Sequence, residues 1–273
     1  MSVAALLLGD SRFPAGGHAH SGGVEPAVTA GTVAHLGTLE VFLRGRLRTA
    51  GLVAASLAAA ACVACVAAKE SAAPLSPGGT TPRGAADGSA IVSAALDLDD
   101  YWQQLDAEAD ARTPAPAQRE ASRRQGRALL RAARVAWPDA GWLAGLAAGA
   151  ADRGAADGAA GGAVRDEYRG GPHHAVVLGA AAAAAGCTPG EAALIAAYQA
   201  VAGPASAAVR LLALDPMRAT GVLARLAGEI GQVADDGAGY AARPLDDLPC
   251  PSAPALDLLA ETHIGAEVRL FES

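Results

Sequence analysis

Residues 51–68 read GLVAASLAAAACVACVAA, an alanine-rich stretch without a charged side chain. Alanine has the highest intrinsic helix propensity, so the stretch predicts a helix. It is long enough for a membrane span to be considered. Because alanine is only weakly apolar, we predict instead a helix buried among its neighbours at the centre of the molecule.

The whole chain has the composition of a helical protein. Its 273 residues are 52% hydrophobic, but only 4% are aromatic and 18% are charged. The core must therefore be built from alanine, leucine and valine, whereas strands favour β-branched and aromatic residues. We predict a single all-α domain over residues 1–273, a bundle of about nine or ten helices with loops at 71–89 and around 152–172.

Helical periodicity and helix-boundary signals divide the chain further. Thr32 is predicted to cap the first long helix. Thr188, followed by Pro189 and Glu191, carries the start signal of another helix, which Pro204 is expected to kink. The expected helices cover approximately residues 33–50, 52–69, 91–111, 117–136, 141–151, 174–185, 189–214, 216–233 and 255–261, with an irregular segment at 235–254.

The segment 71–89, SAAPLSPGGTTPRGAADGS, is rich in proline, glycine, serine and threonine. Such a composition sustains neither helical nor strand periodicity and offers little apolar surface to bury. We predict an exposed, mobile insertion whose removal leaves stability and partner binding nearly unchanged.

The net charge of −7 argues against a nucleic-acid-binding protein, which needs a concentrated positive face. The N-terminal sequence MSVAALLLGDSRFP lacks the positive region and the long apolar run of a secretory signal. We therefore expect a cytoplasmic protein that binds neither nucleic acid nor membrane.

The four cysteines, Cys62, Cys65, Cys187 and Cys250, are too few and too scattered for a disulfide framework. Cys62 and Cys65 form a C-x-x-C pattern, which can indicate zinc or redox chemistry. They lie within an apolar helix with no second ligand pair nearby, so we predict buried thiols that act as small hydrophobic side chains.

Residues 16–25, GGHAHSGGVE, are the stretch that most invites a chemical function. No lysine follows the glycines as in a phosphate-binding loop, and no G-x-S-x-G elbow surrounds Ser21. His18 and His20 offer two imidazoles for a metal site, but the third and fourth ligands would have to come from elsewhere in the chain; a metalloenzyme that also uses His173 is the alternative function. Without a catalytic set, the stretch is interpreted as an ordered turn or a partner-binding element.

The opening LLLGDSRFPAGGHAHSGGVE resembles the N-terminal signature of the urease accessory protein UreF family, although His18 stands where that family usually has an aromatic residue. Further similarity, in the family's order, lies in ASRRQGRALL (121–130), HHAVVLG (173–179), AYQAVAGPASAAVRLLALDP (197–216) and the ending PALDLLAETHIGAEVRLFES. The family's usual ending of the fourth block is closer to leucine-glycine-glutamine, so this chain departs from it at 214–216.

The resemblance implies an all-helical homodimer without enzymatic activity. It implies a chaperone that binds UreH and the GTPase UreG, regulates that GTPase and assists nickel insertion into apo-urease. It further implies that no cofactor is bound stably, because the complex as a whole handles nickel. The candidate partner-binding residues are His20, Ser21, Glu25, Arg123, Arg124, His173, Arg210, His263, Arg269, Leu270 and Phe271, and no catalytic or resident metal-ligating residue is expected.

Two of these assignments carry an alternative. Arg210 is expected near the GTPase-binding surface, or else in an ion pair with Glu191 or Asp215. The tail 262–273 contains the apolar pair Leu270 and Phe271, which is expected to be exposed and to anchor in a groove of UreH. The alternative is that the tail folds back onto its own domain.

Overall fold

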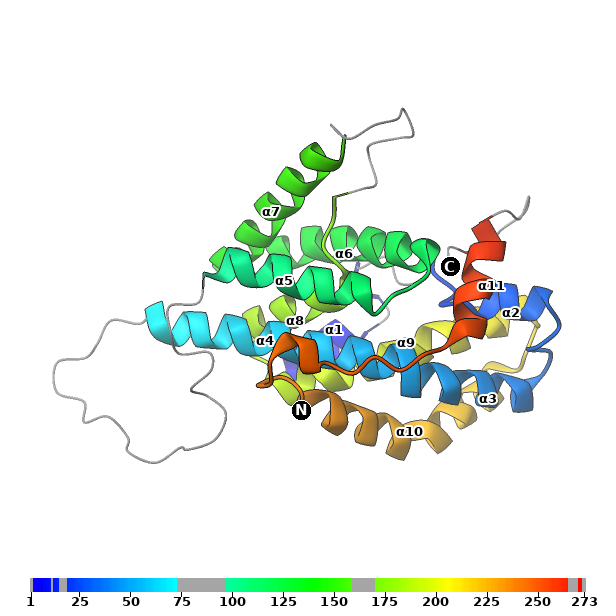
Figure 1. Ribbon diagram of the computed structural model, residues 1–273. Coiled ribbons are helices and arrows are strands. Elements are labelled where there is room, and N and C mark those ends of the chain that lie inside the picture. Colours follow the sequence, from blue (N-terminus) through cyan, green and yellow to red (C-terminus); the bar gives the residue numbers. More distant parts are fainter. Residues whose placement is uncertain are drawn as a thin grey trace.

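The computed structural model describes residues 2–10, 12–14, 19–72, 97–158, 170–264 and 270–271. Every regular element among them is a helix, and one hydrophobic core joins nearly all of these helices. The all-α prediction is therefore confirmed. Helix α4 (Leu52–Ala72) runs through the middle of the bundle (Figure 1) and packs against α8 (His174–Ala184), α9 (Pro189–Leu211) and α10 (Pro216–Ala238).

The remaining helices surround this centre. Figure 1 shows α7 projecting from one end and α11 beside α2 at the other. Their bounds are α1 (Val3–Gly9), α2 (Val24–Thr29), α3 (Leu36–Arg46), α5 (Leu98–Ala111), α6 (Pro116–Ala136), α7 (Gly141–Gly158) and α11 (Pro254–Ile264).

The first two long helices are one continuous rod. The sequence predicted separate helices at 33–50 and 52–69, but α3 passes into α4 through a π-helical segment, η2 (Leu47–Gly51). The predicted cap was also wrong. His35, not Thr32, caps α3: its Nδ1 accepts the N–H of Thr38, whose Oγ1 accepts the N–H of His35. The Thr32 hydroxyl instead donates to the carbonyl of Ala27.

Other boundaries moved as well. Helices α1 and α2 were not predicted, α7 and α10 run beyond their expected ends, and a short 3₁₀ helix, η5 (Leu245–Asp247), lies in the segment expected to be irregular. The first two residues of the predicted insertion 71–89 belong to α4, and the rest of it lies outside the described residues, as does the expected start of a helix at 91. Of the predicted loop at 152–172, residues 159–169 lie outside them.

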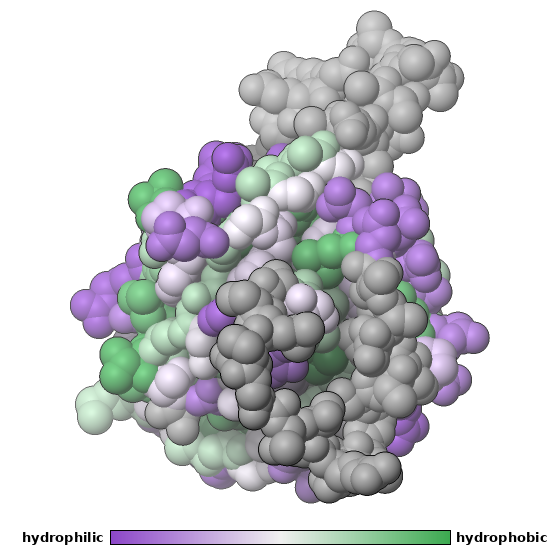
Figure 2. Space-filling view, turned by 90° about the vertical axis from the view of Figure 1, so that its left-hand side faces the viewer, coloured by the Kyte–Doolittle hydropathy of each residue, from purple (hydrophilic) through white to green (hydrophobic). Residues whose placement is uncertain are grey.

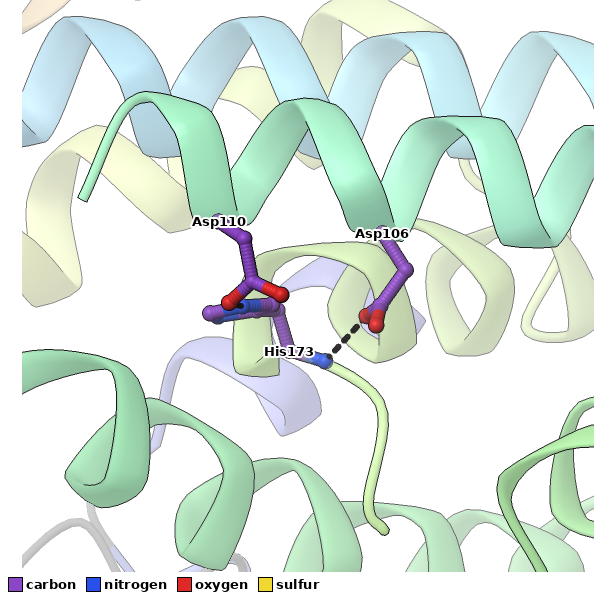
Figure 3. Close-up of side chains that lie close together, drawn as sticks. All are labelled: Asp106, Asp110 and His173. Atoms are coloured by element: carbon purple, nitrogen blue, oxygen red, sulfur yellow. Dashed lines mark hydrogen bonds and ion pairs between the residues drawn. The ribbon is translucent and has the colours of Figure 1, made fainter. Parts of the chain in front are cut away.

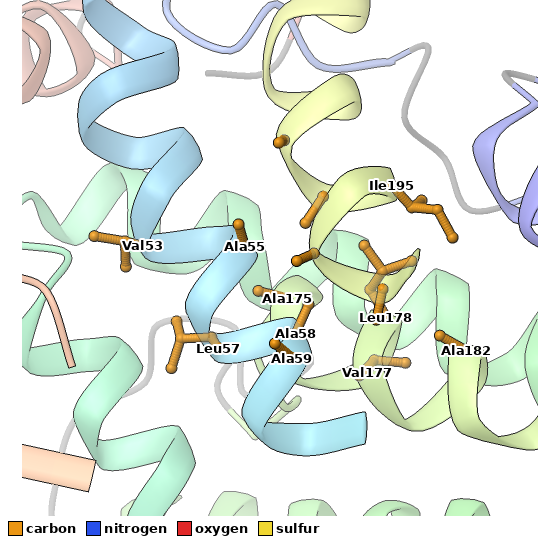
Figure 4. Close-up of a cluster of buried hydrophobic side chains, with 14 of the residues drawn as sticks. Val53, Ala55, Leu57, Ala58, Ala59, Ala175, Val177, Leu178, Ala182 and Ile195 are labelled. Carbon is orange, nitrogen blue, oxygen red and sulfur yellow. The ribbon is translucent and has the colours of Figure 1, made fainter. Parts of the chain in front are cut away.

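The core is made of small side chains. Ala58 and Ala59 on α4 are fully buried, as is Val177 on α8 (Figure 4). Ala61 and Val176 are fully buried too. The continuous helix Leu36–Ser71 and helix α9 are both long and apolar enough to cross a membrane. In their most apolar stretches, however, 67% and 56% of the residues are buried inside the protein. The prediction of a central buried helix is therefore confirmed. On the face shown in Figure 2, hydrophilic residues lie mainly towards the edges and hydrophobic ones form small groups.

The connection between α10 and α11 is held by one arginine. Arg112, at the end of α5, donates to the carbonyls of Leu248 (2.9 Å) and Pro249 (3.2 Å). It also forms an ion pair with Glu108 on its own helix. A guanidinium that satisfies several loop carbonyls replaces the backbone hydrogen bonds that an irregular segment lacks.

Replacing Gly179 by alanine tests the close approach of α8 to α4. A Cβ at residue 179 would lie 2.1 Å from the carbonyl oxygen of Ala58, which is backbone and cannot turn aside. We expect Gly179→Ala to lower the free energy of unfolding by about 1–3 kcal/mol, the usual cost of overpacking a core. Urea unfolding measures this change.

The matched control is Gly231→Ala on α10, where an added Cβ would have nothing within 4 Å. Alanine is the better helix former, so this variant should be neutral or stabilised by up to about 1 kcal/mol. Equal stability of Gly179→Ala and wild type would contradict the packing described.

Candidate functional site

The opening motif forms a tight turn that leads into α2. Gly22 and Gly23 have φ values of 58° and 85°, in the left-handed region where glycine is favoured. Ser21 is fully buried, and its Oγ accepts the backbone N–H of Glu25 at 3.3 Å. His18 lies outside the described residues, whereas His20 is half-buried and lines a groove. Residues 19–25 of the motif therefore form an ordered turn, as interpreted from the sequence, and residues 16–18 lie outside the described part of the chain.

This turn places the carboxylate of Glu25 next to residues 270–271 of the C-terminal segment. One carboxylate oxygen accepts the backbone N–H of Leu270 at 2.8 Å, and the other accepts that of Phe271 at 2.9 Å. His263, buried on α11, places Nε2 3.3 Å from the same carboxylate and 3.3 Å from the carbonyl of Phe271. We call this arrangement of Glu25, His263 and residues 270–271 the tail clamp.

The tail clamp corrects the prediction for the chain end. Phe271 is buried, with 7% of its surface exposed, so only Leu270, at 73%, is the exposed apolar side chain that was expected. Residues 270–271 follow the alternative prediction instead, because they fold back onto their own domain. Arg269 lies outside the described residues.

Arg210 belongs to the same site. Its guanidinium lies over the ring of Phe271, 5.4 Å from the centroid, which is the geometry of a cation–π contact. Glu191 instead accepts the backbone N–H groups of Ser2 and Thr188, and Asp215 caps α10. Whether Arg210 also meets a GTPase stays a prediction.

A second buried cluster surrounds His173 at the start of α8 (Figure 3). Its backbone N–H donates to Asp106 at 2.9 Å, and its Nε2 lies 2.8 Å from Asp110 Oδ1. Its Nδ1 lies 2.9 Å from Ser122 Oγ, which also accepts the N–H of His174. Ser122 therefore contacts both the ring of His173 and the first backbone N–H of α8, and the imidazole lies between Ser122 and Asp110.

Arg123 closes the cluster. It bridges Asp106 (2.8 Å) and Asp110 (2.6 Å) and donates to the carbonyl of Gly171 at 2.5 Å. Burial raises the pKa of the Asp110 carboxyl, but the hydrogen bond with His173 and the charges of His173 and Arg123 outweigh it and lower that pKa to about 2. The other predicted arginine, Arg124, pairs with Glu120 on its own helix at 3.5 Å.

The ligand atoms of Asp106, Asp110 and His173 lie within 4.8 Å of one another, which is close enough to hold a metal ion. The donor set does not fit one, however. Both ring nitrogens of His173 face hydrogen-bond partners, and the guanidinium of Arg123 already supplies the positive charge between the carboxylates. The cluster joins α5, α6 and α8 as a structural network.

The prediction that Cys62 and Cys65 are buried thiols is confirmed, and Cys187, for which no prediction was made, is buried as well. Burial raises the pKa of the Cys62 thiol to about 12. A thiol with so high a pKa is protonated and unreactive at neutral pH. Cys250 is exposed.

A groove of about 1170 Å³ connects these sites. His20, His173, His174 and Phe271 line it, together with Arg46 from the end of α3. Burial and the nearby His20 lower the pKa of His174 to about 4, so His174 is neutral at pH 7. Sequence reasoning missed Asp106, Asp110, Ser122 and Arg46. The only available signal was the i, i+4 spacing of the two aspartates, which places them on one helix face.

Comparison with known proteins identifies the family. The UreF family profile matches residues 33–227, most of the chain. The chain belongs to the UreF family. The urease accessory protein UreF of Mycobacterium sp. (strain JLS) is 42% identical over 268 residues, covering 98% of this chain and 97% of that protein. That of Mycobacterium tuberculosis (strain ATCC 25618 / H37Rv) is 40% identical over 273 residues. The resemblance seen in the sequence is confirmed, and with it a role in urease maturation.

Replacing Glu25 by glutamine should release the C-terminal segment. Glutamine offers one uncharged acceptor in place of two charged ones, and hydrogen bonds to charged groups are worth about 1.5–3 kcal/mol each. We expect amide hydrogen exchange at residues 270–271 to become at least tenfold faster in Glu25→Gln. The control is Glu229→Gln. Glu229 also joins segments that are distant in sequence, but it pairs with Arg44 and Arg48. Unchanged exchange in Glu25→Gln would contradict the clamp.

The Asp110 carboxylate should contribute a pH-dependent part of the stability. Because its folded-state pKa lies below the ordinary 3.8, the contribution is complete above about pH 4 and is lost as the pH falls towards 2. Asp110→Asn should lose stability at neutral pH and unfold with a shallower pH dependence between pH 4 and 2. Acid unfolding followed by circular dichroism measures the slope, with the exposed Asp139→Asn as control. A slope equal to that of wild type would refute the assignment.

Proposed function

We propose that this chain is a non-enzymatic assembly factor of urease maturation that works in the cytoplasm as a homodimer. It binds a UreH-type accessory protein and a UreG-type GTPase, regulates that GTPase and assists the passage of nickel to apo-urease. No cofactor is bound stably by the chain itself. Nickel is the cargo of the whole complex.

The observation that carries the proposal is similarity over essentially the full length to proteins named urease accessory protein UreF. The chemistry of the described residues is compatible with it. Among the described residues, His173 is engaged with Asp106 and Asp110, and Glu25 is engaged with backbone N–H groups. Such groups hold segments in place and leave recognition to exposed side chains.

The tail clamp sharpens the partner assignment. It fixes the backbone of residues 270 and 271, buries Phe271 and leaves Leu270 exposed beside them. A large apolar side chain held on a rigid backbone loses little conformational entropy when it binds, which favours its use as an anchor. In this proposal Leu270 contacts the UreH-type protein and Arg210 lies near the GTPase.

The test is binding of the UreH-type protein to a Leu270→Ala variant. We expect the variant to fold normally and to bind at least tenfold more weakly, because a hot-spot side chain is worth more than about 1.4 kcal/mol. Val135→Ala, also a large apolar side chain at 83% exposure, is the matched control and should bind like wild type. Titration calorimetry with the purified proteins gives both affinities. Unchanged affinity of Leu270→Ala would remove the anchor from the proposal.

The wider function is tested by co-expression with the neighbouring urease genes. Wild type should co-purify with both accessory proteins, and the purified chain alone should carry no stoichiometric metal. Tightly bound metal that is lost on replacing His20 and His173 together would favour the metalloenzyme instead. Failure to recover either accessory protein would refute the assembly role.

A further inference from the structure

Arg46 is an arginine of the groove that pairs with no carboxylate in the described part of the chain. Its Nε donates to the backbone carbonyl of Ala200 at 3.0 Å, and its two terminal nitrogens make no hydrogen bond or ion pair with any described residue. The neighbouring Arg44 and Arg48 both pair with Glu229. The only carboxylate among the groove residues is Asp10, and Arg12 already occupies it.

The position of Arg46 is fixed by the proline inside α9. Pro204 has no N–H, so the carbonyl of Ala200, four residues earlier, lacks its helical donor. The Nε–H of Arg46 takes that place. Gly22 packs on the same pair, since a Cβ there would lie 2.8 Å from Pro204 Cγ and 3.2 Å from Arg46 Cζ. The guanidinium is therefore held by one edge against α9 and by one face against the opening motif.

The setting of Arg46 is unusual in two further respects. It immediately precedes the π-helical segment Leu47–Gly51, and π turns are frequently found at functional sites. Burial lowers the pKa of Arg46 to about 10, so the side chain is still charged at pH 7 although it is partly removed from water. A partly desolvated cation without a counter-ion is costly to maintain, and an anion from outside would stabilise it.

The groove is larger than small ligands require. Its volume of about 1170 Å³ exceeds the roughly 300–1,000 Å³ of pockets for small molecules. Its lining includes the apolar side chains of Leu8, Phe13, Val53, Leu57 and Leu223. An extended peptide with apolar side chains and one acidic residue matches both the size of the groove and the unpaired charge of Arg46.

We propose that the groove receives an apolar segment of a partner protein and that the terminal nitrogens of Arg46 bind an aspartate or glutamate carboxylate of that segment. A guanidinium held at Nε presents its two remaining nitrogens as a fork, which suits a carboxylate in bidentate geometry. The proposal rests on the proposed function in one respect only, the choice of the UreH-type and UreG-type proteins as the source of the segment.

The first experiment uses two synthetic peptides that differ in one residue, N-acetyl-Leu-Asp-Leu-amide and N-acetyl-Leu-Asn-Leu-amide. Each is titrated into the full-length protein while the NMR signal of the Arg46 Nε–H is followed. We expect the acidic peptide to shift this signal and the amide peptide to leave it unchanged. Arg48→Gln, two residues further along and with a side chain that is 64% exposed, should respond like wild type. Equal effects of the two peptides on wild type would overturn the carboxylate site.

The second experiment measures the affinity of each accessory protein for wild type, Arg46→Gln and Arg48→Gln. We expect at least tenfold weaker binding of one partner to Arg46→Gln only, with a weaker dependence on salt. Arg46→Lys keeps the charge and a donor for Ala200, and should bind with intermediate affinity if the fork matters. Circular dichroism verifies that each variant is folded.

The outcomes separate this proposal from the proposed function. If the acidic peptide shifts Arg46 but neither accessory protein binds wild type, the carboxylate site stands and the assembly role falls. If both proteins bind Arg46→Gln as tightly as wild type, the groove is not where they insert a segment, and the assignment of the occupant is overturned.

Discussion

The close contact between α4 and α8 is the constraint on which the rest of the bundle depends. Gly179 lies so near the backbone of Ala58 that no side chain fits between them. Alanine and glycine give little apolar area per residue, so the helices gain stability by approaching closely enough for their backbones to pack. The depth at which α8 sits then decides where His173, at its N-terminus, meets Asp106 on α5.

The buried polar groups act as joints between segments that are distant in sequence. Glu25 holds the chain end, more than two hundred residues away, and Arg123 with His173 ties α5 and α6 to the start of α8. Each group has its hydrogen-bonding capacity met by named partners, which a buried charge requires. A buried histidine beside two carboxylates invites a catalytic or metal-binding interpretation, but the neighbours of His173 assign it to structure.

Arg46 shows how one local irregularity creates the setting for another. Pro204 removes a donor from α9, Arg46 replaces it, and Gly22 of the opening motif leaves the space that this contact needs. The guanidinium is thereby oriented, and its remaining donors face a groove instead of a carboxylate. The same opening motif thus contributes to both the tail clamp and the groove.

The sequence by itself determined the helical class, the central buried helix, the capped start of α9 and the family, because helix propensity, capping and residue patterns are local properties. It did not determine that α3 and α4 are continuous through η2. It also did not determine that His35 caps α3, because Thr32 carries a local capping signal of its own. The tail clamp and the His173 cluster were decided only by the tertiary structure. Their hydrogen bonds join residues separated by tens to hundreds of positions, and a single sequence carries no signal for which distant carboxylate meets which histidine or amide.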